Sequence, residues 1–216
     1  MLEIQKFEVN ALRENCYVVS DETKECVIID CGAYDNEEFQ EIADYIKKND
    51  LKPVHLLSTH GHIDHNFGND FMLKEYGLKA EVHEKDRKLM ESMQEQAQMI
   101  FGMTRTINIP QATVGRYFTE EDTIRFGNHE FAIIETPGHS PGSVFFYCEK
   151  EKVAFSGDTL FMGSIGRTDF MGGSMFQIIM SLRTVCQMDD DIKLYPGHGM
   201  DTTIGYECAT NMYLDR

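Results

Sequence analysis

The segment His60–His65, which reads His-Gly-His-Ile-Asp-His, constrains this chain most, because four of its six residues carry metal-binding side chains. Residues two apart in an extended segment point to the same side, so His60 and His62 can converge on one ion. Asp64 and His65 follow a predicted turn and are expected to face elsewhere. A solvated polar turn with incidental histidines is the alternative, and the density of ligand types disfavours it. The spacing suggests two metal ions.

Two ions need more ligands than this segment holds, because a catalytic zinc ion usually has three protein ligands and an open position for water. Three later turns each follow a predicted strand and carry a missing ligand type: Thr136–Gly142 with His139, Ser156–Thr159 with Asp158, and Tyr195–Gly199 with His198. Alone, each would more often be a turn residue. Together they complete a set of seven candidate metal ligands: His60, His62, Asp64, His65, His139, Asp158 and His198.

Length and charge limit the other functions open to the chain. Its 216 residues, 42% hydrophobic, can form one core without disulfides, and we expect a single domain over residues 1–216. A formal net charge of −16 disfavours nucleic-acid and anionic membrane partners. The N-terminus lacks the apolar core of a signal peptide, and no uncharged apolar run is long enough to span a bilayer. These features predict a soluble, cytoplasmic protein with a small-molecule partner.

The cysteines do not form a C-x-x-C pair, and four of the six lie in or beside apolar stretches. They are Cys16, Cys26, Cys31, Cys148, Cys186 and Cys208. We interpret them as buried thiols in a reducing compartment, with a disulfide or a metal-binding role as the less favoured alternative.

Apolar periodicity predicts two halves with the same order of elements. In the first half we expect strands at Leu2–Val9, Cys16–Ser20, Cys26–Asp30, Pro53–Leu57 and Lys79–His83, and helices at Asn36–Asn49 and at Asn66–Tyr76, the latter capped by Asn66. In the second half we expect strands at Glu130–Glu135, Ser143–Tyr147, Lys152–Ser156 and Lys193–Tyr195, and helices at Ser174–Met188 and Ile204–Leu214. Two such halves, packed sheet to sheet with helices outside and ligands at strand ends, make an α/β (α+β) four-layer αβ/βα sandwich.

Between the halves, the methionine-rich stretch Glu84–Met103 carries a helical apolar stripe, which is either core packing or a lid over the site. Arg105–Phe118 lacks periodicity and is expected to connect the halves across the surface. Asp30, at a strand end, is interpreted as a residue that orients a ligand or forms a turn. The remaining histidines are interpreted as core, structural or exposed residues: His55, His83 and His129.

The order and spacing of the seven candidate ligands resemble the metallo-β-lactamase superfamily over essentially the whole chain. The resemblance implies one ion on His60, His62 and His139, a second on Asp64, His65 and His198, and a bridging Asp158. Gly157–Phe161 and Gly166–Asp169 are similar to the glyoxalase II and persulfide dioxygenase signature, in which residue 167 is a Lys or Arg near the substrate's carboxylate. Only eighteen residues follow the last ligand, so the chain is most similar to the short bacterial glyoxalase II form.

The chemistry that these ligands would allow suits the glyoxalase II group that the chain resembles. Two divalent ions, most readily zinc, with iron or manganese possible, make hydroxide available at neutral pH and polarise a carbonyl. Asp64 can orient the water and take its proton, and a thiolate leaving group needs little acid assistance. We therefore expect a dinuclear hydrolase in which a metal-bridging hydroxide cleaves a small thioester, most readily an S-(2-hydroxyacyl) thiol such as S-lactoylglutathione. The acyl group, the thiol carrier and the oligomeric state stay open.

Two alternatives and one ambiguous residue accompany this prediction. The first alternative is a mononuclear iron persulfide dioxygenase, in which His60, His139 and Asp158 would form a two-histidine, one-carboxylate set. A metal-binding module without catalysis is disfavoured, because it needs neither seven ligands nor an open coordination position. In so acidic a chain, Arg167 either forms a surface ion pair or binds a substrate carboxylate.

Overall fold

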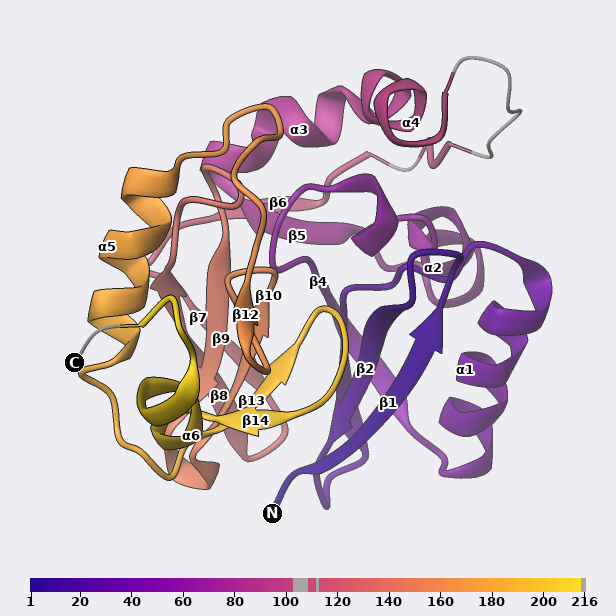
Figure 1. Cartoon of the computed structure of the whole chain (residues 1–216). Helices are drawn as coiled ribbons and strands as arrows, with labels where there is room; N and C mark the ends of the chain where they lie inside the picture. Colours follow the sequence, from indigo (N-terminus) through magenta and orange to yellow (C-terminus); the bar gives the residue numbers. More distant parts are fainter. Residues whose placement is uncertain (103–108, 112, 215–216) are drawn as a thin grey trace.

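Two six-stranded sheets form the centre of the molecule in the computed structural model (Figure 1), which describes residues 1–102, 109–111 and 113–214. The first sheet has the spatial order β1 (Glu3–Val9), β2 (Glu14–Ser20), β3 (Glu25–Ile29), β4 (Lys52–Leu57), β5 (Ala80–His83) and β6 (Arg116–Phe118). The second has the order β14 (Thr202–Thr203), β13 (Lys193–Pro196), β10 (Val153–Gly157), β9 (Val144–Cys148), β8 (His129–Glu135) and β7 (Thr123–Phe126). A separate ribbon pairs β11 (Leu160–Phe161) with β12 (Ser164–Ile165).

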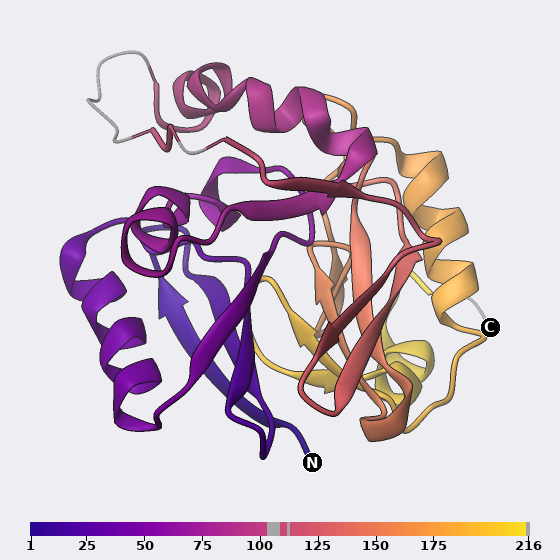
Figure 2. The same cartoon turned by 180° about the vertical axis from the view of Figure 1, so that it is seen from behind.

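Helices cover the outer faces of both sheets, as Figures 1 and 2 show from opposite sides. The first sheet packs against α1 (Asn36–Lys48) and α2 (Asn69–Tyr76), the second against α5 (Met175–Val185) and α6 (Ile204–Thr210). One end of the sandwich carries α3 (Arg87–Glu91) and α4 (Met93–Phe101). Short 3₁₀ turns are η1 (Ile63–His65), η2 (Glu84–Asp86) and η3 (Glu149–Glu151). The predicted four-layer α/β sandwich is confirmed.

The alternation of side chains along β2 explains how the layers pack. Tyr17 and Val19 point into the core between the sheets, whereas Cys16 and Val18 point into the core beneath the helices. All seven residues of this strand are buried, and both of its faces meet apolar cores, which is why residues 16–19 read as a continuous apolar run rather than as an alternating one. The inter-sheet core also contains five phenylalanines, each of which contributes on the order of 2 kcal/mol when fully buried.

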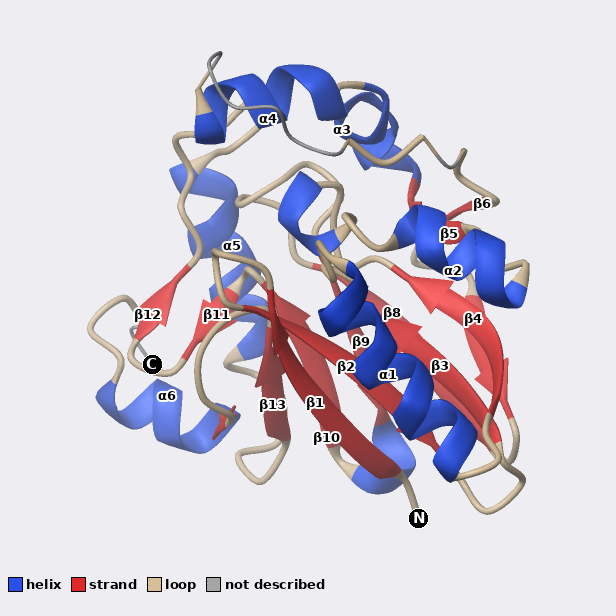
Figure 3. Cartoon of the chain, turned by 90° about the vertical axis from the view of Figure 1, so that its right-hand side faces the viewer, coloured by secondary structure: helices blue, strands red, loops and turns tan. Residues whose placement is uncertain are grey.

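Helix α1 brings the ends of β3 and β4 to one edge of the first sheet (Figure 3). Asp35 caps this helix by accepting hydrogen bonds from the backbone N–H groups of Glu37 and Glu38, and the last turn carries two lysines that complement the helix dipole. Its buried stripe anchors it on the sheet. Because β3 and β4 are parallel, the loops that follow both strands lie together.

The predicted helix at Asn66–Tyr76 begins three residues later than expected, at Asn69, and Gly68 occupies the cap position. The prediction that Asn66 caps it is therefore wrong. The side-chain amide of Asn66 instead donates hydrogen bonds to the carbonyl oxygens of His60 and His62, at 3.3 and 2.7 Å. Its Oδ1, the atom that would cap a helix, accepts instead from Ser58 Oγ at 2.8 Å and from Asn69 Nδ2 at 3.1 Å.

The predicted connector Arg105–Phe118 lies partly outside the described residues, and its last three residues form β6. Strands β11, β12 and β14 were also not predicted, because two residues are too few for periodicity to appear, and the four-residue β7 was not predicted either. The stretch Glu84–Met103 is helical from η2 to α4 with a break at Ser92, and Met103 lies outside the described residues.

The histidines outside the ligand set form ion pairs. His83 contacts Glu135, and buried His129 contacts Asp21, so both are structural as predicted. His55 is only half-buried rather than a core residue, because its ring pairs with Glu81 on the neighbouring strand. Five of the six cysteines are buried. In the part of the chain that is described, no helix combines the length and apolar character needed to cross a bilayer.

Candidate metal centre

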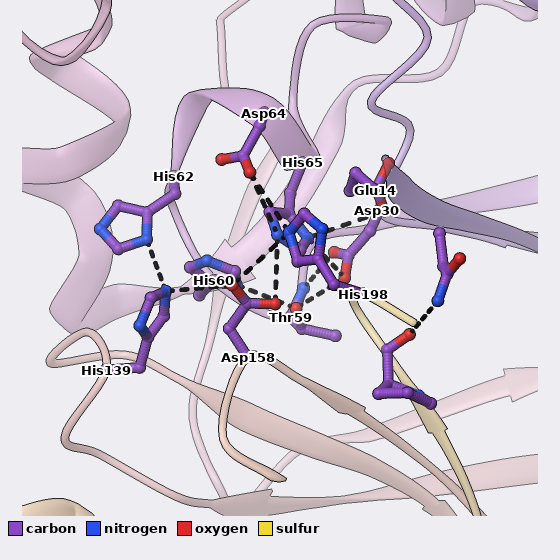
Figure 4. A network of polar contacts seen from close by, with 12 residues as sticks. Glu14, Asp30, Thr59, His60, His62, Asp64, His65, His139, Asp158 and His198 are labelled. Atoms are coloured by element: carbon purple, nitrogen blue, oxygen red, sulfur yellow. Dashed lines mark hydrogen bonds and ion pairs between the residues drawn. The ribbon is translucent and has the colours of Figure 1, made fainter. Parts of the chain in front are cut away.

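All seven candidate ligands meet at one edge of the sandwich, each in a loop after the C-terminal end of a strand (Figure 4). The loop after β4 carries four of them, and the loops after β8, β10 and β13 carry His139, Asp158 and His198. The pairs β3–β4 and β10–β13 are parallel, so these strand ends lie on the same side of their sheets. Residues up to 138 positions apart in sequence, from His60 to His198, therefore come together.

Three histidines form the first cluster. His60, His62 and His139 each offer one ring nitrogen, and these nitrogens lie within 4.8 Å of one another. The closest pair is His62 Nδ1 and His139 Nε2, at 2.8 Å. The two-residue spacing of His60 and His62 thus directs both rings to one point, as the extended segment predicts.

The second cluster consists of Asp64, His65 and His198, whose ligand atoms also lie within 4.8 Å of one another. Asp64 Oδ2 is 3.4 Å from His198 Nε2 and 3.8 Å from His65 Nε2. The turn η1 separates this aspartate and histidine from the two preceding histidines. They consequently face a different point, as predicted.

Asp158 lies between the two clusters and contacts both. Its Oδ1 is 3.4 Å from His65 Nε2, and its Oδ2 is 3.4 Å from His139 Nε2 and 3.7 Å from His198 Nε2. One carboxylate that faces two groups of ligands through its two oxygens has the arrangement of a bridging ligand.

Unpartnered polar atoms at the centre fit metal ions. His60 Nε2 is buried and has no hydrogen-bond partner among the described residues, and the buried His65 Nε2 and Asp158 Oδ1 face each other at 3.4 Å without forming a hydrogen bond. Buried polar atoms without partners are costly, and a bound cation would satisfy all three. Imidazole nitrogens with carboxylate oxygens suit zinc, iron or manganese.

Two histidines of the first cluster, His60 and His62, are held neutral. Burial, followed by the nearby His65, lowers the pKa of His60 well below its usual value. Burial, followed by the adjacent His139, lowers the pKa of His62 to about 3. Neutral imidazole is the form that binds a metal, so these rings need not lose a proton first.

The carboxylates at the centre favour positive charge on the groups that lie between them. Burial opposes ionisation of Asp158, but His65 and His198 outweigh it and hold the pKa of this carboxyl well below its usual range. Burial likewise opposes a charge on His65, yet Asp158, Asp64 and Asp30 raise its pKa well above the usual value. These carboxylates thus favour the protonated, positively charged form of the His65 imidazole. A divalent cation would supply the same neutralising charge.

Neighbouring groups fix the rings by binding their Nδ1 atoms. His139 Nδ1 lies 2.7 Å from the carbonyl oxygen of Arg167, to which it donates, and Asp30 Oδ2 lies 3.1 Å from His65 Nδ1. Asp30 also accepts hydrogen bonds from the backbone N–H and the hydroxyl of Thr59. With Nδ1 occupied, Nε2 is left to face the centre. Asp30 therefore contacts a ligand in the orienting manner predicted for it.

Asp86, which the sequence did not single out, ties the two metal-ligand loops together. Its Oδ2 accepts hydrogen bonds from Gly61 N at 2.8 Å and Ser140 Oγ at 2.6 Å, and its Oδ1 accepts from Gly142 N at 2.6 Å. The first loop carries His60 and His62, the second His139. The Gln96 side chain makes two more hydrogen bonds to the first loop: it accepts one from Ile63 N and donates one to the carbonyl of Gly61.

Glu14 is a second residue that sequence reasoning missed. It is fully buried, and its Oε1 lies 3.7 Å from His65 Nδ1. Burial raises its pKa well above the usual value, because burial disfavours the charged carboxylate. No motif surrounds Glu14, and the adjacent Asn15 pairs with the His198 loop through Gly197, so only the fold brings it to the centre.

Gly197 is required by close packing. A Cβ atom here would lie 2.4 Å from Asp158 Oδ1 and 2.6 Å from His65 Cε1. Both distances are too short for any side chain, and both neighbours belong to the centre. The glycine before His198 therefore leaves room for the central carboxylate.

A cavity of about 300 Å³ opens onto the centre. Its walls are formed by Leu12, His62, Asp64, Ile100, His139, Asp158, Phe161, Arg167, Phe170 and His198. A smaller, mostly apolar recess adjoins it between α4 and Phe170. Ile100 on α4 lies in both walls, so the methionine-rich segment packs in a core and also covers part of the cavity.

Arg167 lies at the rim of this cavity. Its Nε and Nη2 donate to the two carboxylate oxygens of Asp169 at 2.9 and 2.8 Å, and its guanidinium lies 4.1 Å from the ring centroid of Phe170. The side chain is about 62% exposed. The predicted surface ion pair is thus present, at a position from which the guanidinium can also reach a molecule in the cavity.

Comparison with known proteins agrees with this geometry. The model of the metallo-β-lactamase superfamily matches residues 9–198. The chain belongs to this superfamily. It is 39% identical over 219 residues to the hydroxyacylglutathione hydrolase GloC of Haemophilus influenzae, a match that covers 99% of each chain. The predicted superfamily and its likeness to the glyoxalase II group are therefore confirmed.

Solved structures give the same result. The B3 metallo-β-lactamase BLEG-1 superposes with a TM-score of 0.89 at 31% identity, over 99% of this chain and 100% of that one. TTHA1623 in a di-iron-bound form superposes with a TM-score of 0.83 at 30% identity, over 97% and 100%. The chain is accordingly a hydrolase of a superfamily that binds divalent metals.

Proposed function

We propose that this chain is a dinuclear metal-dependent hydrolase that cleaves a small thioester, best represented by an S-(2-hydroxyacyl) thiol such as S-lactoylglutathione. The observation that carries the proposal is Asp158, which faces two complete three-residue clusters through its two oxygens. The relative named hydroxyacylglutathione hydrolase supports the substrate class.

In this proposal the first ion is held by His60, His62 and His139, the second by Asp64, His65 and His198, and both by Asp158. When bound, the ions would lower the pKa of a water molecule and polarise the acyl carbonyl of the substrate. Zinc is the first candidate, with iron or manganese as alternatives. The similar structure in a di-iron-bound form supports a two-ion centre in this fold.

Asp64 has a second role in the proposal. Its Oδ2 makes the contacts to His65 and His198, and the residue also lines the cavity. We assign Oδ1 to orient the attacking water and to accept its proton. A thiolate leaves without a strong acid, so the reaction does not depend on a further proton donor.

Arg167 is proposed to bind a carboxylate of the thiol portion. It lies in the cavity wall, where its backbone carbonyl accepts a hydrogen bond from His139 and its guanidinium packs over the Phe170 ring. The loop that orients His139 therefore also places the Arg167 guanidinium at the cavity. A substrate carboxylate would replace Asp169 as the bidentate partner. The acidic surface repels other polyanions, which favours a small molecule over nucleic acid or membrane.

The alternative, an iron persulfide dioxygenase, would use His60, His139 and Asp158 alone. It gives no role to the cluster of Asp64, His65 and His198, which is as closely assembled as the first. The completeness of this second cluster favours hydrolysis, because thioester cleavage draws on both ions and oxygen chemistry on one.

The test compares zinc-loaded and iron-loaded protein in two assays: anaerobic thiol release from S-lactoylglutathione, and oxygen uptake with glutathione persulfide. A β-lactam serves as a third substrate, because one similar structure is a β-lactamase. We expect thiol release with either metal, its loss in Asp158→Ala, and its retention in Asp191→Ala, which changes a side chain that is 63% exposed and precedes the far end of β13. Iron-dependent oxygen uptake with negligible thioester cleavage, or turnover of the β-lactam alone, would refute the proposal.

A further inference from the structure

Two cysteines far from the metal centre lie unusually close together. The Sγ atoms of Cys186 and Cys208 are 2.8 Å apart, which is closer than two sulfur atoms in ordinary van der Waals contact. Cys186 ends α5, and Cys208 lies within α6, the two helices on the outer face of the second sheet (Figure 1). A disulfide has an S–S bond of about 2.05 Å, so a small movement would allow the bond to form.

Accessibility distinguishes this pair from the other cysteines. Cys208 is the one cysteine that is not fully buried, whereas Cys186 lies beneath it in the core. Cys16 is also close to another thiol: it forms a hydrogen bond with Cys31, which raises the pKa of Cys16. Both of these residues are buried. Burial raises the pKa of Cys26 to about 12, which makes its thiolate scarce. A soluble oxidant therefore meets Cys208 first.

We propose that Cys186 and Cys208 are a thiol–disulfide exchange site for a small disulfide of the glutathione disulfide type. The Cys208 thiolate attacks one sulfur of the small disulfide, forms a mixed disulfide and releases one small thiolate. The Cys186 thiolate then attacks Cys208 Sγ, forms the internal bond and releases the second thiolate. Two protein thiols are oxidised, one small disulfide is reduced to two thiols, and the two thiol protons pass to solvent or to the released thiolates.

The bond would join two helices, each of which contacts a segment that lines the cavity. On α6, Glu207 accepts a hydrogen bond from Gly163 N at 2.9 Å in the β11–β12 ribbon, which carries the cavity residue Phe161. On α5, Ser181 Oγ donates to the carbonyl of Pro137 at 2.7 Å, in the loop of His139. Closing a loop of 22 residues (208 minus 186) should raise the Tm of the oxidised protein by about 5–10 °C.

The experiment treats reduced protein with excess glutathione disulfide under native conditions, followed by thiol counting, intact mass and peptide mapping. We expect the wild type to lose two thiols, to yield one cross-linked peptide pair containing residues 186 and 208, and to recover on reduction. Cys186→Ala should accumulate a mixed disulfide with one glutathione at Cys208. Cys208→Ala should stay unmodified, and Cys148→Ala, a buried control, should behave as the wild type does.

Three results would overturn the proposal: wild type that keeps all its thiols, a cross-link that joins Cys16 to Cys31 instead, or wild type that stops at the mixed disulfide. Cys208→Ala alters a partly exposed position, so its result does not depend on the tolerance of the core to Cys186→Ala. The thiol and mass readouts require no thioester substrate and no metal, so they are independent of the proposed function.

Discussion

Replacing Asp86 with alanine tests how the two metal-ligand loops are held together. The substitution removes three short hydrogen bonds to a buried carboxylate and leaves Gly61 N, Ser140 Oγ and Gly142 N without that partner. Hydrogen bonds to charged groups contribute roughly 1.5–3 kcal/mol each, and partial hydration of the new space offsets some of the loss. We therefore expect the free energy of unfolding to fall by about 3–5 kcal/mol.

The consequence for the metal centre should be larger than the loss of stability alone would suggest. Asp86 joins the loop of His62 to the loop of His139, and groups that hold ligands in place typically account for about 10–100-fold in metal affinity. Denaturant unfolding of the metal-free variant gives the first quantity, and competition with a chromophoric chelator gives the second. Asp86→Asn, which keeps the shape but not the charge, should be intermediate in both.

Asp21→Ala is the matched control. Asp21 is another buried carboxylate that accepts several hydrogen bonds, including those from Asn128 N at 2.6 Å and Thr23 N at 2.9 Å. Glu14 begins β2 and Asp21 follows its last residue, so the two residues lie roughly 20 Å apart along the strand. Asp21, Glu22 and His129 could also hold an ion, so the comparison concerns the seven-residue centre alone: Asp21→Ala should lower stability without changing the metal affinity of that centre. If both variants left metal affinity unchanged, Asp86 would be a structural residue only, and the argument that it positions the loops would be wrong.

Three further predictions follow from single contacts. Gly197→Ala places a Cβ 2.4 Å from Asp158 Oδ1, so elemental analysis should show metal content reduced by at least half, while a folded far-UV spectrum is retained. Arg167→Ala should raise the KM for anionic thioesters about 10–100-fold without loss of metal, and an unchanged KM would leave this residue in its surface ion pair. The hydrogen bond with Glu81 raises the pKa of His55, so this pair contributes stability that is complete below about pH 6 and is lost as pH rises through the raised value. In denaturant titrations, His55→Gln should therefore lower the free energy of unfolding by on the order of 1 kcal/mol at about pH 6 and by almost nothing at about pH 9.

Those parts of the fold that depend on local pattern could be predicted from the sequence. The long strands and helices have enough residues for periodicity to show, and ligand types in turns after strands indicated the edge at which they meet. His60 and His62 were predicted to converge because extended geometry alone places them on one side. Strands of two residues, such as β11 and β14, carry no such signal.

Most supporting residues of the centre, unlike Asp30 at its strand end, could not be predicted, because their partners are distant in sequence. Asp86 binds Ser140 and Gly142, 54 and 56 residues away, and no motif marks either end of that contact. Asn66 has the residue type of a helix cap, but its amide meets two carbonyls of the loop that it follows. The function of Arg167 stayed ambiguous for a related reason: its ion pair with Asp169 and its place in the cavity wall are both real features of the fold.

The central claim is that two ions, held by seven residues around Asp158, act together on a thioester. The most direct measurement adds zinc stepwise to metal-free protein and follows both bound zinc and the anaerobic rate of thiol release from S-lactoylglutathione. The two-cluster geometry predicts that the rate reaches its maximum only when close to two ions are bound per chain. A full rate at one ion per chain, with no second ion bound in excess zinc, would contradict the account.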